Sequence, residues 1–360
     1  MQTFYKKRRA ANRVRKPIVH QFNKFTLYEE CEGESLLQAK PVEKVPEQSI
    51  VGSGTGLFHR IRHKLIVRGE WQLYLLILPV VVYFIIFNYI PMYGLQIAFK
   101  NYNITKTIFE AKWVGLNYFE RFINSPMFSQ LFKNTIILSL YDLLIGFPFP
   151  VIFALVLNQT QSKKLVKFSQ TVTFAPYFIS MVVLVGMLYL FLSPSSGIVN
   201  KLIEALGGDP IYFMAESSWF RHIYVLSHVW QRTGYQAIIY FAALTSIDIG
   251  LYEAATLDGA SKLQKIWYID LPSITPTIVT MLLLAVGRML NVDAQRTLLM
   301  QVPTNLNTSE VFGTYVYKVG LLNTQFSYST AINLFQTMIN LILLIIVNYT
   351  SKKLTEESLW

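Results

Sequence analysis

The sequence predicts an all-α membrane protein with six transmembrane helices. Of its 360 residues, 52% are hydrophobic and only 15% are charged. The apolar residues gather into runs of about twenty, the length that crosses a hydrocarbon layer of roughly 30 Å as a helix. They follow neither the alternation of strands nor the period of amphipathic helices. Composition and run length together indicate a polytopic membrane protein.

Six runs are long enough to cross the membrane, and the charges between them set their direction. Lys163, Lys164 and Lys167 fill the connection between the second and third runs, and Lys352 and Lys353 follow the last. Because cytoplasmic connections carry the excess of lysine and arginine, both chain ends are predicted to face the cytoplasm of a bacterial-type plasma membrane. The six runs are residues 71–90, 135–157, 171–193, 222–244, 273–290 and 331–349.

Proline and glycine interrupt several of these runs. Pro79 lies in the first run, Gly146, Pro148 and Pro150 lie in the second, and Pro276 lies in the fifth. Each proline removes a backbone donor, and such breaks are tolerated in a membrane where helices pack or where a cavity runs. Plain kinks are the default interpretation, and hinges for alternating access are the alternative.

The region before the first run is predicted to be a separate tail. Eight cations precede the first acidic residue, Glu29, and an acidic stretch follows. Because this region has no sustained apolar period, we expect a mobile cytoplasmic tail whose basic arm is either solvated or in contact with anionic lipid. Much of the net charge of +11 lies here, so we do not interpret it as a nucleic-acid site. The predicted division is tail 1–56, basic membrane-flanking segment 57–70, six-span domain 71–349 and cytoplasmic C-terminus 350–360.

The loop at residues 248–272, between the fourth and fifth runs, is too polar to cross a membrane. Asp248 can cap a first short helix, and Gly259 can adopt the positive φ that ends it. Ser261 can cap a second short helix, and Pro272 suits the first turn of the next span. Four small residues keep the surface of this element low: Ala254, Ala255, Gly259 and Ala260. A bent element of this kind is suited to a groove in another protein.

No catalytic machinery is visible in the sequence. It lacks the Gly-x-x-x-x-Gly-Lys-Ser/Thr loop that cradles ATP phosphates, and it lacks the His-Glu-x-x-His and Gly-x-Ser-x-Gly motifs of hydrolases. The glycines of 52–56 have no accompanying lysine and are interpreted as a linker. His59 and His63 stand among cations that would repel a metal ion. We therefore predict no catalytic residue, no metal and no cofactor bound by this chain.

Ionisable residues within the predicted spans are few. Asp142 lies in the second, Arg232 in the fourth and Arg288 near the end of the fifth. A charge at membrane depth costs at least about 2.5 kcal/mol, so each is expected to face a partner or a watery cavity. We hypothesise that Asp142 and Arg232 approach one another, either as an ion pair that fixes helix register or in the transport path. Arg288 can instead extend toward the membrane surface.

Aromatic and amide side chains surround Arg232. Rings bind the apolar C–H faces of sugars, and amide and guanidinium groups bind their hydroxyls. Positions 231 and 235 share one helical face while 232, 236 and 240 share another, so both sets cannot fully line one path. Packing within the membrane is the alternative role. The candidate substrate-path residues are Trp230, Gln231, Arg232, Tyr235, Gln236, Tyr240 and Asp142.

The 248–272 loop resembles the signature of permease subunits of ATP-binding-cassette (ABC) importers. It reads Glu-Ala-Ala, three residues, Gly, nine residues and Ile-x-Leu-Pro. In that family the loop is the coupling helix that docks into a cleft of the cytoplasmic ATPase. The resemblance assigns docking to Glu253, Ala254, Ala255, Asp258, Gly259, Ile269, Leu271 and Pro272.

Further segments resemble the carbohydrate-type, LplB-like branch of that family, which is related more distantly to the maltose permease subunit MalF. These segments are residues 113–119, 176–180, 314–318 and 359–360. The sequence from Asn291 to Arg296 departs from the branch, whose members tend to have Phe-Glu after the same Asn-Val. The resemblance covers residues 69–360 and leaves the tail unmatched.

The resemblance implies a type I importer permease that takes up oligosaccharides or polysaccharide fragments. The implied partners are cytoplasmic ATPase subunits that carry ATP and Mg²⁺, a second and different permease subunit, an extracytoplasmic solute-binding protein, a glycan substrate and membrane lipid, without nucleic acid. An ABC importer permease for peptides or polyamines is one alternative. An ATP-independent secondary transporter is another.

Overall fold

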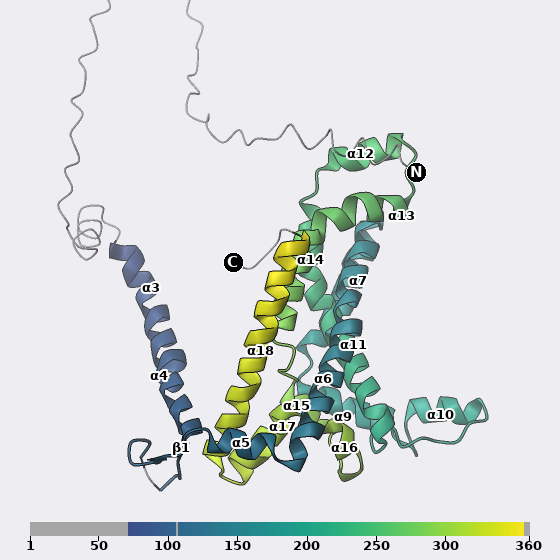
Figure 1. Cartoon of the computed structure of the whole chain (residues 1–360). Helices are drawn as coiled ribbons and strands as arrows, with labels where there is room; N and C mark the ends of the chain where they lie inside the picture. Colours follow the sequence, from purple (N-terminus) through teal and green to yellow (C-terminus); the bar gives the residue numbers. More distant parts are fainter. Residues whose placement is uncertain (1–70, 106, 356–360) are drawn as a thin grey trace, which may run out of the picture. The chain divides into compact units, whose positions relative to one another are not determined.

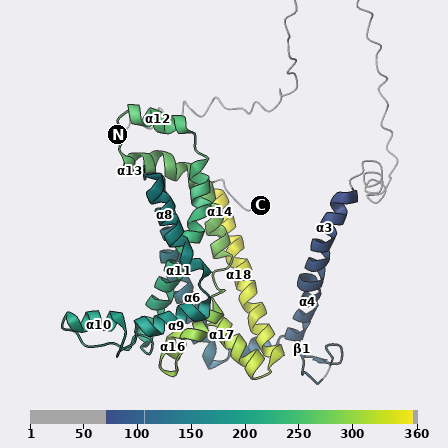
Figure 2. The same ribbon diagram turned by 180° about the vertical axis from the view of Figure 1, so that it is seen from behind.

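The computed structural model describes residues 71–105 and 107–355, and this part of the chain is mostly helical. The predicted tail 1–56, the basic segment 57–70 and residues 356–360 lie outside the described residues. Four helical segments are long and apolar enough to cross a membrane, and there are up to six if each of two bent helix pairs counts as one span. The arrangement is shown in Figures 1 and 2.

The first helical segment combines α3 (Trp71–Phe84), η1 (Ile85–Tyr89), α4 (Ile90–Met92) and η2 (Tyr93–Phe99). Its apolar window has no residue buried against the rest of the described chain. Only its end is anchored, since η2 packs against α18 (Phe326–Thr355). A short antiparallel pair, β1 (Lys100–Asn101) with β2 (Lys112–Trp113), follows, and Ser327 Oγ of α18 donates to Lys100 O at 2.7 Å. The sequence did not predict this hairpin.

The second segment starts earlier than its apolar run. After α5 (Asn117–Ile123), α6 (Pro126–Gly146) and α7 (Pro148–Asn158) form one continuous span. The prolines at 148 and 150 lie in the first turn of α7, just after Phe147, which keeps a helical backbone conformation with φ −71° and ψ −43°. The helix therefore restarts without a sharp bend.

The third run is bent by 101° between its two halves. The first half is α8 (Lys163–Phe174) with η3 (Ala175–Phe178), and the second is α9 (Met181–Phe191). Pro176 cannot donate to the preceding turn, and Ser180 starts α9 by accepting from Val183 N. The Ile179 carbonyl at the break accepts a hydrogen bond from Gln231 Nε2 at 3.0 Å, so the broken backbone is satisfied by a neighbouring helix.

The longest central helix is α11 (Ser217–Thr245), which follows the short α10 (Ile198–Ala205). It packs against α6, α7, α8 and α14 (Leu271–Val286). Two hydrophobic clusters surround it, one with Leu138, Leu184 and Val225, and one with Ala154, Tyr240 and Ile274. α11 thereby holds the second, third and fifth spans together.

Between α11 and α14 the chain forms α12 (Ile249–Leu257), α13 (Lys262–Lys265) and the π-turn η4 (Ile266–Asp270). α13, η4 and α14 run as one helix, so no break separates the loop from the fifth span. After α14 a compact group of short helices precedes α18. These are α15 (Ala294–Met300), η5 (Pro303–Asn305), α16 (Leu306–Ser309), α17 (Phe312–Tyr317) and η6 (Lys318–Leu322).

Candidate functional site

The helices α12 and α13 form a hairpin at one end of the bundle (Figure 1). Asp248 Oδ1 accepts from Gly250 N at 3.0 Å and caps α12, while Gly259 has a φ of 72°. Ser261 and Gln264 form a reciprocal capping box at α13, in which Ser261 N donates to Gln264 Oε1 at 2.7 Å. The capping residues predicted from the sequence are confirmed, because caps depend on local chain geometry.

The α12–α13 hairpin is fixed to the spans by a buried carboxylate. Asp270 has 0% exposure, and its oxygens accept from Gln159 Nε2 at 2.6 Å, from Asn158 Nδ2 at 3.3 Å and from Tyr252 OH. Burial, and then the hydrogen bond to Asp270, raise the pKa of Tyr252 to about 12, so its hydroxyl stays protonated and donates. Lys265 Nζ also donates to Thr256 Oγ1 at 2.7 Å and joins α13 to α12.

The predicted docking residues fall into two groups in the structure. Glu253, Ala254, Asp258 and Gly259 are exposed, and Ala255 is half-buried. Beside them the hairpin exposes large apolar side chains, among them Leu257 at 90% and Leu263 at 69% exposure. Of the second group, Ile269 and Leu271 are half-buried and Pro272 is exposed at the start of α14. Leu271 packs against the cluster around Ile274, so this end of the motif roots the hairpin in the bundle.

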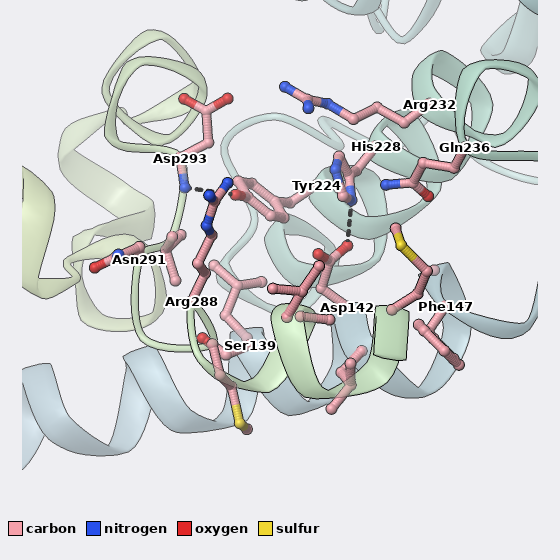
Figure 3. Close-up of a pocket in the computed structure, with 18 of the residues that line it drawn as sticks. Ser139, Asp142, Phe147, Tyr224, His228, Arg232, Gln236, Arg288, Asn291 and Asp293 are labelled. Atoms are coloured by element: carbon pink, nitrogen blue, oxygen red, sulfur yellow. Dashed lines mark hydrogen bonds and ion pairs between the residues drawn. The ribbon is translucent and has the colours of Figure 1, made fainter. Parts of the chain in front are cut away.

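A cavity of about 450 Å³ lies among α6, α11, α14 and the segment after α14 (Figure 3). The helix α11 contributes side chains four residues apart, which lie on one face. They are Tyr224, His228, Arg232, Gln236 and Tyr240. From the opposite side come Arg288, Asn291 and Asp293, and α6 supplies Ser139 and Asp142. The cavity thus combines an aromatic and aliphatic wall with a small set of charged and amide groups, as small-molecule sites do.

Asp142 pairs with His228 and not with Arg232. Asp142 Oδ1 lies 2.6 Å from His228 Nδ1, and Figure 3 shows the pair joined across the cavity wall. Gly146 lies beside the pair, and a Cβ there would be in ordinary van der Waals contact with it, 3.4 Å from Asp142 Oδ1 and 3.8 Å from His228 Nδ1. The hypothesis that Asp142 approaches Arg232 as an ion pair is therefore wrong. Sequence reasoning missed His228, although its position one turn before Arg232 was the signal that would have found it.

The two arginines of the cavity have no carboxylate partner within the described residues. Arg232 makes no ion pair or side-chain hydrogen bond there, and its buried Nε lacks an acceptor. Arg288 likewise has no side-chain partner in this part of the chain, and it lines the cavity instead of extending outward. The carboxylate of Asp142 is hydrogen-bonded to His228, and the carboxylate of Asp293 caps α15 by accepting from Arg296 N at 3.1 Å.

The cavity brings together only part of the predicted substrate path. Asp142, Arg232, Gln236 and Tyr240 line it, whereas the three other candidates lie elsewhere. Tyr235 stacks on Tyr177 at a centroid distance of 4.0 Å, and Gln231 is buried. Trp230 is 49% exposed and is not among the lining residues. Helical periodicity places these two sets on different faces of α11, and the structure shows that the face with Arg232, Gln236 and Tyr240 lines the cavity.

Arg296 is a buried arginine whose contacts were not predicted from the sequence. It is fully buried, its guanidinium donates to Gln231 Oε1 and Ser227 Oγ, and it lies 5.4 Å above the Tyr224 ring. It therefore holds α15 against α11 behind the cavity wall. Within the described part of the chain, no three His, Cys, Asp or Glu side chains gather as metal ligands.

Long apolar helices with a polar cavity between them and an exposed hairpin at one end are features of a membrane permease. The chain belongs to the family of binding-protein-dependent transport system inner membrane components, whose profile matches residues 122–356. It is a multi-pass type I permease subunit of an ABC importer and not itself an enzyme. Family membership excludes the ATP-independent secondary transporter.

Several known proteins are similar to this chain over most of its length. It is 37% identical over 319 residues to the protein LplB of Bacillus subtilis, covering 89% of this chain and 99% of the relative. It is 41% identical over 301 residues to the polygalacturonan/rhamnogalacturonan transport system permease protein YteP of the same species, covering 83% and 94%. A crystal structure of a bacterial ABC transporter involved in import of the acidic polysaccharide alginate contains a chain with a TM-score of 0.75 and 38% identity, covering 82% and 99%. The resemblance to the LplB-like branch is confirmed.

Proposed function

We propose that this permease subunit imports oligosaccharides or polysaccharide fragments that carry carboxylates, and that they pass through the cavity among α6, α11 and α14. The observation that carries the proposal is a pair of guanidinium groups in the cavity lining, Arg232 and Arg288, that have no ion-pair partner in the described part of the chain. A planar guanidinium matches a carboxylate geometrically and electrostatically. Relatives that handle alginate or polygalacturonan support the same substrate class.

The neutral part of the lining suits a sugar. Phe147 presents apolar ring surface and the largely buried Tyr240 borders the cavity, while Gln236 and Asn291 supply amide donors and acceptors for hydroxyl groups. Asp142, held by His228, completes the polar side. We include Asp142, Arg232, Gln236 and Tyr240 in the substrate path and assign packing roles to Gln231 and Tyr235.

The cavity chemistry disfavours one of the alternative solutes. A polyamine carries several positive charges and would meet the two cations Arg232 and Arg288, while the carboxylates of the lining, Asp142 and Asp293, are each already hydrogen-bonded. Like charges at short range repel, so a polyamine fits this lining less well than an acidic glycan. A peptide importer remains the same-class alternative, and its discriminator is whether peptides compete with acidic glycans for transport.

The proposed partners follow from the hairpin and from the family. Cytoplasmic ATPase subunits, which hold ATP and Mg²⁺, would close on the exposed face of α12 around Glu253 and Ala254. A second, different permease subunit would complete the path, and an extracytoplasmic solute-binding protein would deliver the glycan, as the family description requires a binding protein. Closure of the ATPases would then move the hairpin and rock the spans.

The proposed orientation places the hairpin in the cytoplasm. The start of α8, with Lys163 and Lys164, and the end of α18, with Lys352 and Lys353, lie at the same end of the bundle as α12 and α13 (Figures 1 and 2). Lysine-rich flanks mark the cytoplasmic side of membrane proteins. Both chain ends would therefore lie inside the cell.

Uptake by the assembled complex tests the proposal. Proteoliposomes that hold this chain, its partner permease, the ATPases and the binding protein would receive an oligogalacturonate or its neutral, carboxyl-reduced counterpart. Arg232→Gln and Arg288→Gln should each lower uptake of the acidic glycan about tenfold or more, since a hydrogen bond to a charged group contributes about 1.5–3 kcal/mol. Lys133→Gln, an exposed cation on α6, is the matched control. Equal loss for acidic and neutral glycans, or no loss, would contradict the proposal.

A further inference from the structure

The hydrogen bonds of Asp270 connect three segments that are distant in sequence. Asp270 ends η4 and leads directly into α14, Tyr252 belongs to α12, and Asn158 and Gln159 lie at the end of α7. Partners of Asp270 are thus 18 residues away in Tyr252 and 112 residues away in Asn158. Asn158 Nδ2 also donates to Tyr252 OH at 3.2 Å and closes the group into a ring of contacts. One carboxylate therefore joins the hairpin, the second span and the fifth span.

The hydrogen-bonded group around Asp270 differs from a surface ion pair, because it is buried and its other members are neutral. Asp270 is fully buried, and no lysine or arginine of the described chain forms a salt bridge with it. Its oxygens are instead satisfied by three neutral donors, from a phenol and two amides. A buried carboxylate that loses such donors is left with an unsatisfied charge, so the group favours being either fully formed or fully open.

The remaining contacts of the hairpin connect α12 to the membrane spans less directly. The bond from Lys265 to Thr256 ties α13 to α12 but reaches no other span. Leu271 and Ile266 pack against the cluster around Ile274 and Leu244, which fixes the base of α14 and leaves α12 free. Within the described residues, the hydrogen bonds that α12 side chains send to α7 and η4 all involve Tyr252.

We propose that Asp270 is a positioning residue for energy coupling, which latches α12 to α7 and α14 so that a displacement of the hairpin moves the second and fifth spans together. The inference rests on the proposed docking of an ATPase on α12. Asp270 itself is fully buried and does not line the cavity, so it would act through its neighbours and not by contact with the ATPase or the glycan. With the latch open, α12 would move with the ATPase while the cavity walls on α6 and α14 lag behind. ATP would then be hydrolysed without a matching movement of substrate.

The test measures glycan transported per ATP hydrolysed by the complete complex in proteoliposomes. Asp270→Asn keeps the shape but exchanges an acceptor for a donor, and Tyr252→Phe removes one hydroxyl. We expect either change to lower transport per ATP about tenfold, while ATPase binding and stimulation of hydrolysis by the loaded binding protein stay within about twofold. Tyr268→Phe, which removes a hydroxyl from a residue of η4 that is 79% exposed, should leave the ratio unchanged.

A charge exchange separates a latch from a merely structural role. Asp270→Asn combined with Asn158→Asp moves the carboxylate to α7 and leaves an acceptor beside Tyr252 OH, so it should recover most of the transport per ATP. An unchanged ratio in Asp270→Asn and Tyr252→Phe would overturn the proposal. So would a loss that merely follows the loss of assembled complex and is not recovered by the double variant.

The same experiment distinguishes failure of the latch from failure of the docking on which it rests. Glu253→Lys lies on the exposed face of α12 and should abolish ATPase binding without touching the Asp270 group. If Glu253→Lys leaves the ATPase bound and transport intact, the docking assignment is wrong. If docking holds and the ratio in Asp270→Asn is unchanged, only the latch is wrong.

Discussion

Replacing Gly234 by alanine should break the contact between α11 and α8. A Cβ at position 234 would lie 2.3 Å from Thr173 O, 2.4 Å from Thr173 C and 2.7 Å from Phe174 N. All three are backbone atoms, so no side chain can rotate away, and the two helices must separate instead. Separation would also disturb the Tyr177–Tyr235 stack and the bond from Gln231 to the Ile179 carbonyl.

The expected cost lies at the upper end of overpacking penalties, about 3 kcal/mol or more of unfolding free energy. Equilibrium unfolding of the purified subunit in mixed detergent micelles, followed by circular dichroism, measures it. Gly186→Ala in α9 is the matched control, because nothing lies within 4 Å of a Cβ there. That change should be neutral or stabilise by up to about 1 kcal/mol, since alanine favours the helix. If the two variants unfold alike, α11 and α8 do not meet through Gly234.

Two further predictions concern polar groups. Asp142→His alone should abolish glycan uptake. Combining it with His228→Asp should restore uptake, because the 2.6 Å contact between positions 142 and 228 can re-form. If uptake stays absent in the double variant, the direction of the pair matters. Asn200→Ala should lower the unfolding free energy by about 3 kcal/mol, since this 1% exposed amide bonds Leu192 O, Ser193 O and both backbone groups of Ile211. A loss below about 0.5 kcal/mol in the same unfolding assay would contradict that role.

Much of the fold and one of the two candidate sites follow from local patterns in the chain. The apolar runs predicted a six-span helical protein because run length alone decides what can cross a bilayer. The hairpin was predicted residue by residue, from Asp248 through Gly259 to Ser261, because caps and positive-φ positions involve atoms two or three residues apart. The docking assignment of Glu253 and its neighbours stays a prediction.

The cavity was only partly predictable. Helical periodicity grouped Arg232 with Gln236 and Tyr240 and separated them from Gln231 and Tyr235, which is what the structure shows. Helical periodicity shows which residues share one face of a helix, but it does not show which other segment that face contacts. It therefore did not show that one face meets Asp142, or that the other meets the broken backbone at Ile179.

The sequence by itself determined the membrane class, the spans as apolar runs, the capped hairpin and the family, since each depends on residue types at short or fixed spacing. Only the tertiary structure decided that Asp142 binds His228, 86 residues away, and that Asp270 joins Asn158, 112 residues away. It also decided that Arg232 and Arg288 line one cavity and have no ion-pair partner among residues 71–105 and 107–355. Such choices depend on which helix faces meet in the bundle, and a chain's local preferences do not specify that.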